Sequence, residues 1–141
     1  MAERLEVRST HRGGWATDVE VRGHQVRVDE PTTVDGGEDS GMMPTELFLA
    51  SLAACFVLAV AFAGRKRDLE VPGLEVVVSA ERAGTELRYH HLRVETRAEL
   101  DDAVLGRLVE RARAFCWVSN TLAAGVDVDY PHTSLDARFR K

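Results

Sequence analysis

The 141-residue chain has only two cysteines, Cys55 and Cys116, and they lie 61 residues apart. This number and spacing exclude a CxxC zinc site and the dense disulfide framework of a small secreted domain. The opening residues MAERLEVRST are charged from the third position, so we expect no signal peptide and a reducing, cytoplasmic location. In that compartment a cysteine pair is more often catalytic or redox-active than structural.

Basic residues are outnumbered, with 18 Lys and Arg against 23 Asp and Glu and a net charge of −5. This balance, without a long basic run, argues against a nucleic-acid partner. The GxGxxG, P-loop and GxSxG motifs are all missing. His90 and His91 are neighbours on an expected strand and point to opposite faces, so they cannot hold one metal ion together. We expect no cofactor and no metal.

One long apolar stretch is present, from Pro44 to Gly64, and Cys55 lies near its middle. Pro44 suits the first turn of a helix, Glu46 suits the positive end of the helix dipole, and Gly64 suits a C-terminal stop. A helix that is apolar all round must be buried on every side, by protein or by lipid. Its length touches the lower limit for a membrane span. Its many small residues, and amphipathic strands on both sides, favour a core helix and no membrane.

The remaining segments divide into alternating and helical patterns. Alternation of polar and apolar residues predicts strands, and an apolar stripe at helical spacing predicts a second helix that Asp101 or Asp102 caps. Ser119 or Asn120 can cap a further short turn. The loop at 30–43 is either a pocket rim or a linker. The predicted strands are 4–9, 15–22, 24–29, 74–82, 87–99 and 126–130, and the second helix begins at 101 or 102 and ends near Cys116.

This order, βββ–α–ββ–α–β, predicts a single α+β domain over residues 1–141. The second helix can cover only part of the long one. A homodimer that buries both long helices against each other is the economical solution.

Two thiols, one in a buried helix and one at a helix end, are either inert packing or a redox pair. Reactivity requires a thiolate, and therefore a positive group such as an arginine nearby. Arg12, beside the glycines of the first predicted turn, is the candidate from the residues alone.

Gly36, Gly37 and Gly41, then PTELFLASLAACF, and some sixty residues later FCWVSNTL, form a pattern that resembles the OsmC/Ohr family. These are the osmotically induced protein C and organic hydroperoxide resistance proteins. The resemblance covers nearly the whole chain. It implies an intertwined α+β homodimer in which two long central helices are flanked by antiparallel sheets.

The resemblance also implies a cysteine-based peroxidase of oxidative-stress defence. Cys55 would attack an organic hydroperoxide, or hydrogen peroxide, and become a sulfenic acid. Cys116 would resolve it as a disulfide, which a dithiol reductant (a lipoylated or thioredoxin-like protein) would reduce. Arg12 is the best match for the arginine that holds the attacking thiolate.

The chain departs from the family at the position of the glutamate that pairs with this arginine. The peroxidases read N-P-E-[QE]-L, whereas Thr45 stands here at the place of the glutamate and Glu46 follows it. On a regular helix Glu46 lies about 180° round the axis from Cys55, and position 45 about 80°. Trp117 also replaces a usual proline. The pattern is closer to the general OsmC-like branch than to a committed hydroperoxide reductase.

Two other interpretations stay open. The chain can be a non-catalytic OsmC-like protein that binds a small apolar ligand in a dimer-interface cavity. It can also be a purely structural or membrane-associated protein, which would depend on detergent.

Overall fold

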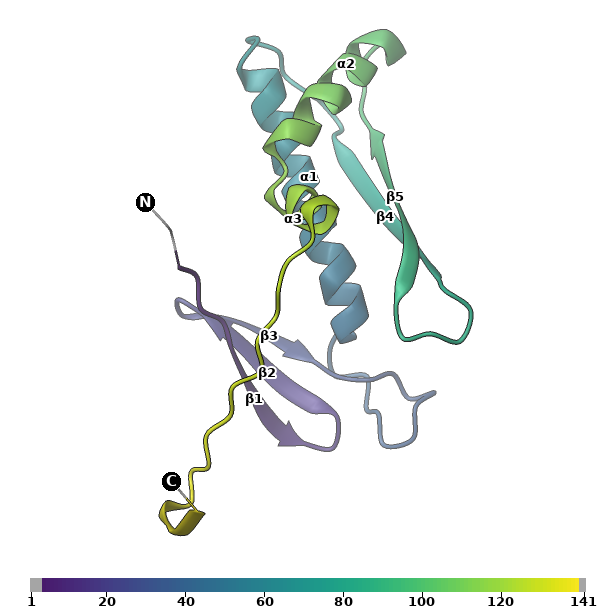
Figure 1. Ribbon diagram of the computed structural model, residues 1–141. Helices are drawn as coiled ribbons and strands as arrows, with labels where there is room; N and C mark the ends of the chain where they lie inside the picture. The colour runs from purple at the N-terminus through teal and green to yellow at the C-terminus, as the bar shows by residue number, and fades with distance from the viewer. Residues whose placement is uncertain (1–3, 140–141) are drawn as a thin grey trace.

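A computed structural model describes residues 4–139 and combines two antiparallel sheets with helices (Figure 1). One sheet has the strand order β1–β2–β3, and the other is the β4–β5 hairpin. This mixture confirms the α+β prediction. The elements are β1 (Arg8–Gly13), β2 (Ala16–Val21), β3 (His24–Val28), α1 (Pro44–Arg65), β4 (Glu75–Arg82), β5 (Tyr89–Arg97), α2 (Asp102–Ala112), η1 (Arg113–Phe115), α3 (Trp117–Ala124) and η2 (Ala137–Phe139).

Helix α1 begins and ends nearly where its sequence predicts. Pro44 occupies the first turn, and the side chain of Glu46 accepts a hydrogen bond of 3.0 Å from the Met43 N–H. At the other end the helix passes Gly64 by one residue. A Cβ on Gly64 would lie 2.7 Å from the Leu69 carbonyl oxygen, because the chain turns back closely against the helix there. Gly64 is therefore required by packing as well as by helix termination.

One face of α1 forms the core of the molecule. It packs against β4, α2 and α3. Its buried residues recur every three or four positions, which places them on one side of the helix. Together with buried residues of α2 and with Cys116 they make one cluster: Leu52, Phe56, Ala59, Val60, Ala63, Leu108, Ala112 and Cys116.

The opposite face of α1 is open in the single chain. Leu58 is 70% exposed and Phe62 is 44% exposed. One chain thus covers α1 only in part, as expected from the sequence, and burial on its remaining side stays a prediction that depends on a second copy. By length and composition α1 could cross a membrane, and it is the single such helix in the described part of the chain. One helix of this kind is weak support for a membrane span and is compatible with the core of a soluble protein.

The β1–β2–β3 sheet lies beyond the N-terminal end of α1 (Figure 1). The predicted first strand, 4–9, is displaced to Arg8–Gly13, so most of the expected turn at 11–14 is strand. Pairing continues through the expected turn with an irregularity in the ladder: His11 pairs with Thr17 and Gly13 pairs with Ala16, which leaves Arg12 as the extra residue of a β-bulge. The loop after β3 is anchored by the buried Asp29.

Three sequence predictions near the C-terminus are wrong in detail. Residues 126–130 are exposed and form no strand, because they pair with none of the strands in the described part of the chain. Helix α2 ends at Ala112 and continues only as the short η1. The cap of α3 is Cys116, in place of Ser119 or Asn120, because the extended backbone of Cys116 (φ −88°, ψ 102°) interrupts the helical path.

Candidate active site at Cys55 and Cys116

The fold brings the two cysteines together. Cys55 lies in the middle of α1, and Cys116 lies at the start of α3, which packs against α1. Cys55 packs against the core cluster that contains Cys116, and the Cys55 thiol helps to lower the pKa of Cys116. Both are free thiols. The contact joins residues 61 positions apart in the sequence, which makes these thiols the centre of the candidate site.

The environment of Cys116 stabilises a thiolate. Burial raises the pKa of this thiol, but the Ser119 side chain and N–H, the Cys55 thiol and the Val118 N–H outweigh it and hold the pKa below its ordinary value. The Ser119 hydroxyl also donates a 3.3 Å hydrogen bond to the Cys116 carbonyl oxygen. The Ser119 nitrogen is 3.5 Å from the sulfur. N–H groups at a helix N-terminus are unpaired within the helix and favour negative charge. Cys116 is completely buried, so a peroxide cannot reach it directly.

Cys55, in contrast, opens onto a cavity of about 850 Å³. The cavity lies between α1, η1 and α3, and Cys55 is its one sulfur-bearing wall residue among the described residues. No Lys or Arg within 4–139 lines it. An apolar molecule therefore has access to Cys55 but not to Cys116. The wall is formed by Cys55, Leu58, Ala59, Phe62, Ala114, Phe115, Trp117, Asn120, Thr121, Ala124, Gly125 and Val126.

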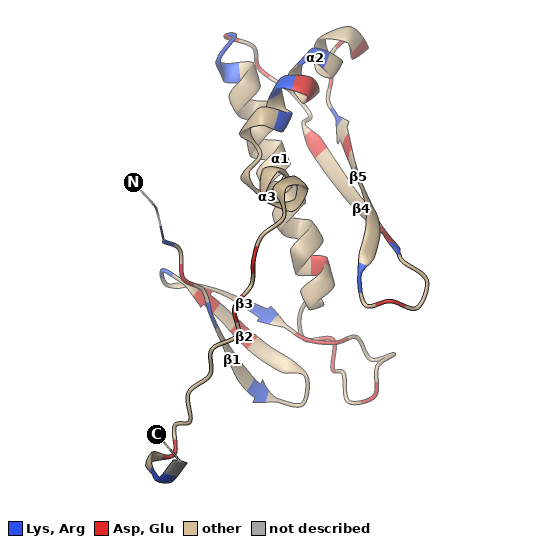
Figure 2. Cartoon of the chain, in the orientation of Figure 1, with Lys and Arg blue, Asp and Glu red and all other residues tan. Residues whose placement is uncertain are grey.

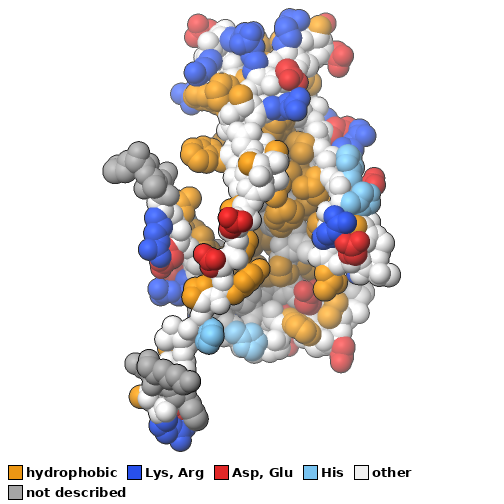
Figure 3. Space-filling model, in the orientation of Figure 1, with side chains coloured by type: hydrophobic (Ala, Val, Ile, Leu, Met, Phe, Trp, Pro, Cys, Tyr) orange, Lys and Arg blue, Asp and Glu red, His pale blue; other side chains and the backbone are white. Residues whose placement is uncertain are grey.

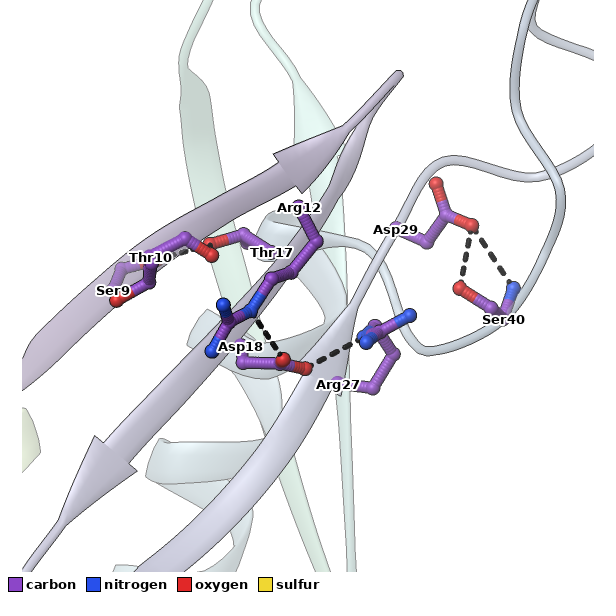
Figure 4. A network of polar contacts seen from close by, with 8 residues as sticks. All are labelled: Ser9, Thr10, Arg12, Thr17, Asp18, Arg27, Asp29 and Ser40. Atoms are coloured by element: carbon purple, nitrogen blue, oxygen red, sulfur yellow. Dashed lines mark hydrogen bonds and ion pairs between the residues drawn. The ribbon is translucent and has the colours of Figure 1, made fainter.

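Arg12 is not part of this cavity wall. Its Nε donates a 2.8 Å hydrogen bond to one carboxylate oxygen of Asp18, and Arg27 Nε donates a 2.7 Å bond to the other. Figure 4 shows this Arg12–Asp18–Arg27 group on the N-terminal sheet. The bonds from Arg27 and Arg12 hold the pKa of Asp18 below its usual value. Within one chain the arginine expected to serve Cys55 is held by Asp18.

Thr45 and Glu46 are also placed away from the thiols. The Glu46 carboxylate accepts a hydrogen bond from the Met43 N–H at the start of its own helix. Thr45 lines a separate hollow formed mainly by the β4–β5 turn, with Arg82 and Tyr89 among its neighbours. Ten residues of helix separate Thr45 from Cys55, a rise of about 15 Å. The structure therefore brings Cys55 and Cys116 together and leaves Arg12, Thr45 and Glu46 apart from them.

Sequence reasoning missed several residues of this site. Ser119 was expected only to cap a turn, yet it binds the Cys116 sulfur. The signal was its place three residues after Cys116, the usual reach of a helix cap. The aromatic pair Phe62 and Phe115, with ring centroids 4.9 Å apart, forms part of the cavity wall and carries no such local signal.

The described residues contain no group of three or more His, Cys, Asp or Glu side chains able to hold a metal ion. The fold is α+β, and its two free thiols belong to one cluster beside an apolar cavity. These features define a class of protein whose candidate active site is a pair of thiols.

Comparison with known proteins identifies the family. The family model described as OsmC-like protein matches residues 37–130. The organic hydroperoxide resistance protein of Xanthomonas axonopodis pv. citri (strain 306) is 30% identical over 105 residues, which are 72% of this chain and 74% of that protein. The chain belongs to the OsmC-like family, within the OsmC/Ohr group that the sequence resembles.

Solved structures share the fold. The OsmC-like protein of Mycoplasma pneumoniae has a TM-score of 0.71 at 17% identity, covering 87% of this chain and 89% of its own. The organic hydroperoxide resistance protein of Legionella pneumophila has a TM-score of 0.66 at 23% identity, covering 90% and 94%. The fold-level resemblance predicted from the motifs is confirmed.

Proposed function

We propose that this protein is a thiol-dependent peroxidase that reduces organic hydroperoxides in oxidative-stress defence. The observation that carries the proposal is that Cys55 faces an apolar cavity and packs against the buried cluster that contains Cys116. The relative named organic hydroperoxide resistance protein supports a role connected with peroxides. A cycle that returns both thiols to the reduced state suits the cytoplasm.

The two environments support different roles for the two thiols. Cys55 faces the cavity, so its thiolate attacks the distal oxygen of the hydroperoxide, the O–O bond breaks, and the alkoxide leaves and takes a proton to become an alcohol. Cys55 is then a sulfenic acid. The thiolate of Cys116, favoured by Ser119, attacks that sulfur and releases hydroxide, which is protonated to water. A dithiol, lipoylated or thioredoxin-like, exchanges with the resulting disulfide and restores both thiols.

A homodimer completes this site in the proposal. Cys55 has no cation in its own cavity wall among the described residues, and a thiolate there needs one. The exposed face of α1 offers an apolar surface for a second copy. We therefore assign the activating guanidinium to Arg12 of the partner subunit, with Asp18 in the place of the family glutamate as its carboxylate partner. Glu46 and Thr45 then have no part in the chemistry.

The test is turnover of cumene hydroperoxide with dithiothreitol or a lipoylated protein as reductant. We expect Cys55→Ser to abolish peroxide consumption. Cys116→Ser should still react once, leaving a sulfenic acid on Cys55 that mass spectrometry detects, but should not form the disulfide. A wild-type protein that consumes no hydroperoxide with either reductant refutes the peroxidase.

The cavity itself favours a second candidate, a non-catalytic protein that binds a small apolar ligand there. Its volume of about 850 Å³ lies within the range typical of small-molecule sites. This candidate predicts that a ligand copurifies with the wild-type protein. The Cys55→Ser and Cys116→Ser variants should bind the same ligand in the same amount. Extraction and mass spectrometry of the purified protein separate the two candidates.

A further inference from the structure

The Arg12–Asp18–Arg27 group contains two guanidinium groups for one carboxylate, and the strand register explains how it forms. Asp18 on β2 lies directly opposite Arg27 on β3, and Arg12 reaches it diagonally from β1 through the bulge. Figure 2 shows Lys and Arg on both strands that flank β2. The Asp18 side chain is 13% exposed, whereas those of Arg12 and Arg27 are 51% and 41% exposed. The carboxylate is thus the least exposed member of the group.

Asp18 holds each arginine through one nitrogen only. One of its oxygens accepts from Arg12 Nε at 2.8 Å and the other accepts from Arg27 Nε at 2.7 Å (Figure 4). An arginine alone with a carboxylate frequently forms two parallel bonds, each to a different oxygen. Because Arg27 occupies the second oxygen, that oxygen is not available to Arg12. Within residues 4–139 no hydrogen bond occupies the terminal nitrogens of Arg12.

Arg27 is itself anchored on two sides. Asp18, and more weakly Asp29 and Glu38, raise the pKa of Arg27 above its ordinary value. The Arg27 side chain also lies against the loop before α1, because a Cβ on Gly41 would be 3.1 Å from Arg27 Cγ. Arg27 therefore has the surroundings of a fixed support, whereas Arg12 is bonded to Asp18 alone among the described side chains.

The helix that carries Cys55 places its own cation far from the thiol. The first Lys or Arg of α1 after Cys55 is Arg65, ten residues on, which is a rise of about 15 Å. Figure 3 shows hydrophobic side chains over the middle of the helices and Lys and Arg gathered at one end of them. In the proposed function the cation comes instead from Arg12 of a second copy. To bind a thiolate, it needs a terminal nitrogen that no carboxylate occupies.

We propose that Arg27 is a positioning residue: by holding one oxygen of Asp18, it leaves the terminal nitrogens of Arg12 free for the thiolate on Cys55 of the partner subunit. This inference rests on the proposed function and adds to it a residue that touches neither thiol nor substrate. Without Arg27, both oxygens of Asp18 turn to Arg12, one terminal nitrogen becomes occupied, and more of the charge is neutralised. The thiolate then loses part of its stabilisation.

The experiment measures alkylation of Cys55 by iodoacetamide against pH in the Cys116→Ser background, so that one thiol reacts. The test variant, Arg27→Met, keeps an unbranched side chain and removes the donor. We expect its rate at pH 7 to fall about five- to tenfold, as for one lost charged hydrogen bond, and its pH–rate profile to move to higher pH. Arg27→Lys keeps a donor and should stay within about twofold. The matched control is Arg22→Met, the same exchange in the β2–β3 turn, with no change in rate expected.

A double variant separates positioning from a general effect of charge or stability. If Arg27 acts through Arg12, Arg27→Met should add nothing to the slowing caused by Arg12→Ala. An additive loss, an equal loss with Arg27→Lys, or an unchanged rate in Arg27→Met overturns the inference. The measurement needs neither peroxide nor reductant, so it tests Arg27 whether or not the protein turns over a hydroperoxide. An Arg12→Ala variant that is alkylated as fast as its parent refutes the assignment of Arg12, and this inference with it.

Discussion

At the scale of single residues, Cys116 shows how a fully buried thiol acquires a lowered pKa. Burial alone would raise it, since the charged form is penalised away from water. The chain interrupts its helix at Cys116, and the N–H groups of the new helix then point at the sulfur. Because Cys116 caps the next helix, its thiolate accepts hydrogen bonds from the first N–H groups of that helix.

Replacing Ser119 with Ala should raise the pKa of Cys116, because the Ser119 side chain is the largest of the influences that lower it. The measurement is a pH titration of the ultraviolet thiolate absorbance in the Cys55→Ser background. Thr121→Val is the control, since the Thr121 hydroxyl donates to the Trp117 carbonyl on the same helix and does not touch sulfur. The same titration curve with and without Ser119 would contradict this account.

The Arg12–Asp18–Arg27 group makes the folding stability of the protein depend on pH in the acid range. The folded pKa of Asp18 is lowered, first by Arg27 and then by Arg12, so its contribution to stability is present above the ordinary pKa and is lost as the pH falls through the lowered one. Asp18→Asn should therefore destabilise the protein at about pH 6 and much less at about pH 3. Denaturant unfolding at both values checks this. Glu20→Gln, on the same strand without a side-chain ion pair in the described structure, is the control.

These residue-scale features differ in how far the sequence predicts them. Helix geometry alone places Glu46 on the far side of α1 from Cys55. In the structure its carboxylate accepts a hydrogen bond from the Met43 N–H. The Asp18 partnership was not predictable, because it depends on a strand register with a bulge at Arg12. A carboxylate six residues from an arginine carries no signal until that register is known.

At the scale of elements, two positions of the family pattern must be glycine because neighbouring backbone atoms leave no room for a Cβ. A Cβ on Gly41 would collide with the Arg27 carbonyl, and one on Gly37 would collide with that of Pro31. These close approaches hold the loop between β3 and α1, where Asp29 also accepts from the Ser40 N–H (3.1 Å) and hydroxyl (2.7 Å). The loop is a fixed connection before the Cys55 helix.

Gly41→Ala should accordingly lower the free energy of unfolding by about 1–3 kcal/mol, the usual cost of overpacking. Gly106→Ala is the opposite case. Gly106 lies inside α2 with nothing within 4 Å of its Cβ position, so alanine should raise the free energy of unfolding by about 0.5–1 kcal/mol. Thermal and denaturant unfolding of both variants check the pair, and destabilisation by both would refute the spatial argument.

Residues 126–130 show why one predicted element is missing. Their alternation of valine and aspartate, ending in Tyr130, is a strand pattern, and Val126 is 70% exposed and Tyr130 86% exposed. A strand needs a neighbour for its backbone hydrogen bonds. The pattern therefore predicts pairing that a single chain does not supply, whereas α1 satisfies its backbone internally and was predicted nearly to the residue.

If this segment pairs with a sheet edge of a second copy, Val128→Pro should weaken the dimer, because proline removes an N–H donor from the ladder. Val128→Thr keeps the donor and the branched side chain and is the control. Sedimentation velocity over a dilution series should show dissociation of the proline variant at concentrations where the control is dimeric. Equal dimer stability in the two variants would exclude backbone pairing there.

At the scale of the whole molecule, the arrangement separates the groups that a peroxidase needs. Two thiols and their cavity lie with the helices, while Arg12 and Asp18 lie on the N-terminal sheet beyond the start of α1 (Figure 1). In one chain the cavity has an open apolar side and no cation in its described wall. On the proposed function, a second copy would supply both an apolar cover and an arginine, so that assembly and activation of Cys55 would be one event.

Mixed dimers test this directly. Cys55→Ser and Arg12→Ala chains should each be inactive alone. If Arg12 serves the partner's thiol, a mixed dimer holds one site with both residues intact. Random mixing makes half the dimers mixed, with one of two sites intact in each, so about a quarter of wild-type activity should return.

If Arg12 instead served its own chain, every site in the mixture would lack one of the two residues and no activity would return. The control mixes Cys55→Ser with Cys116→Ser. Cys55 and Cys116 of one chain lie in the same cluster, so each site of that mixed dimer lacks one of the two thiols, and no disulfide should form. Recovery in the first mixture without recovery in the second requires an active site built from both subunits.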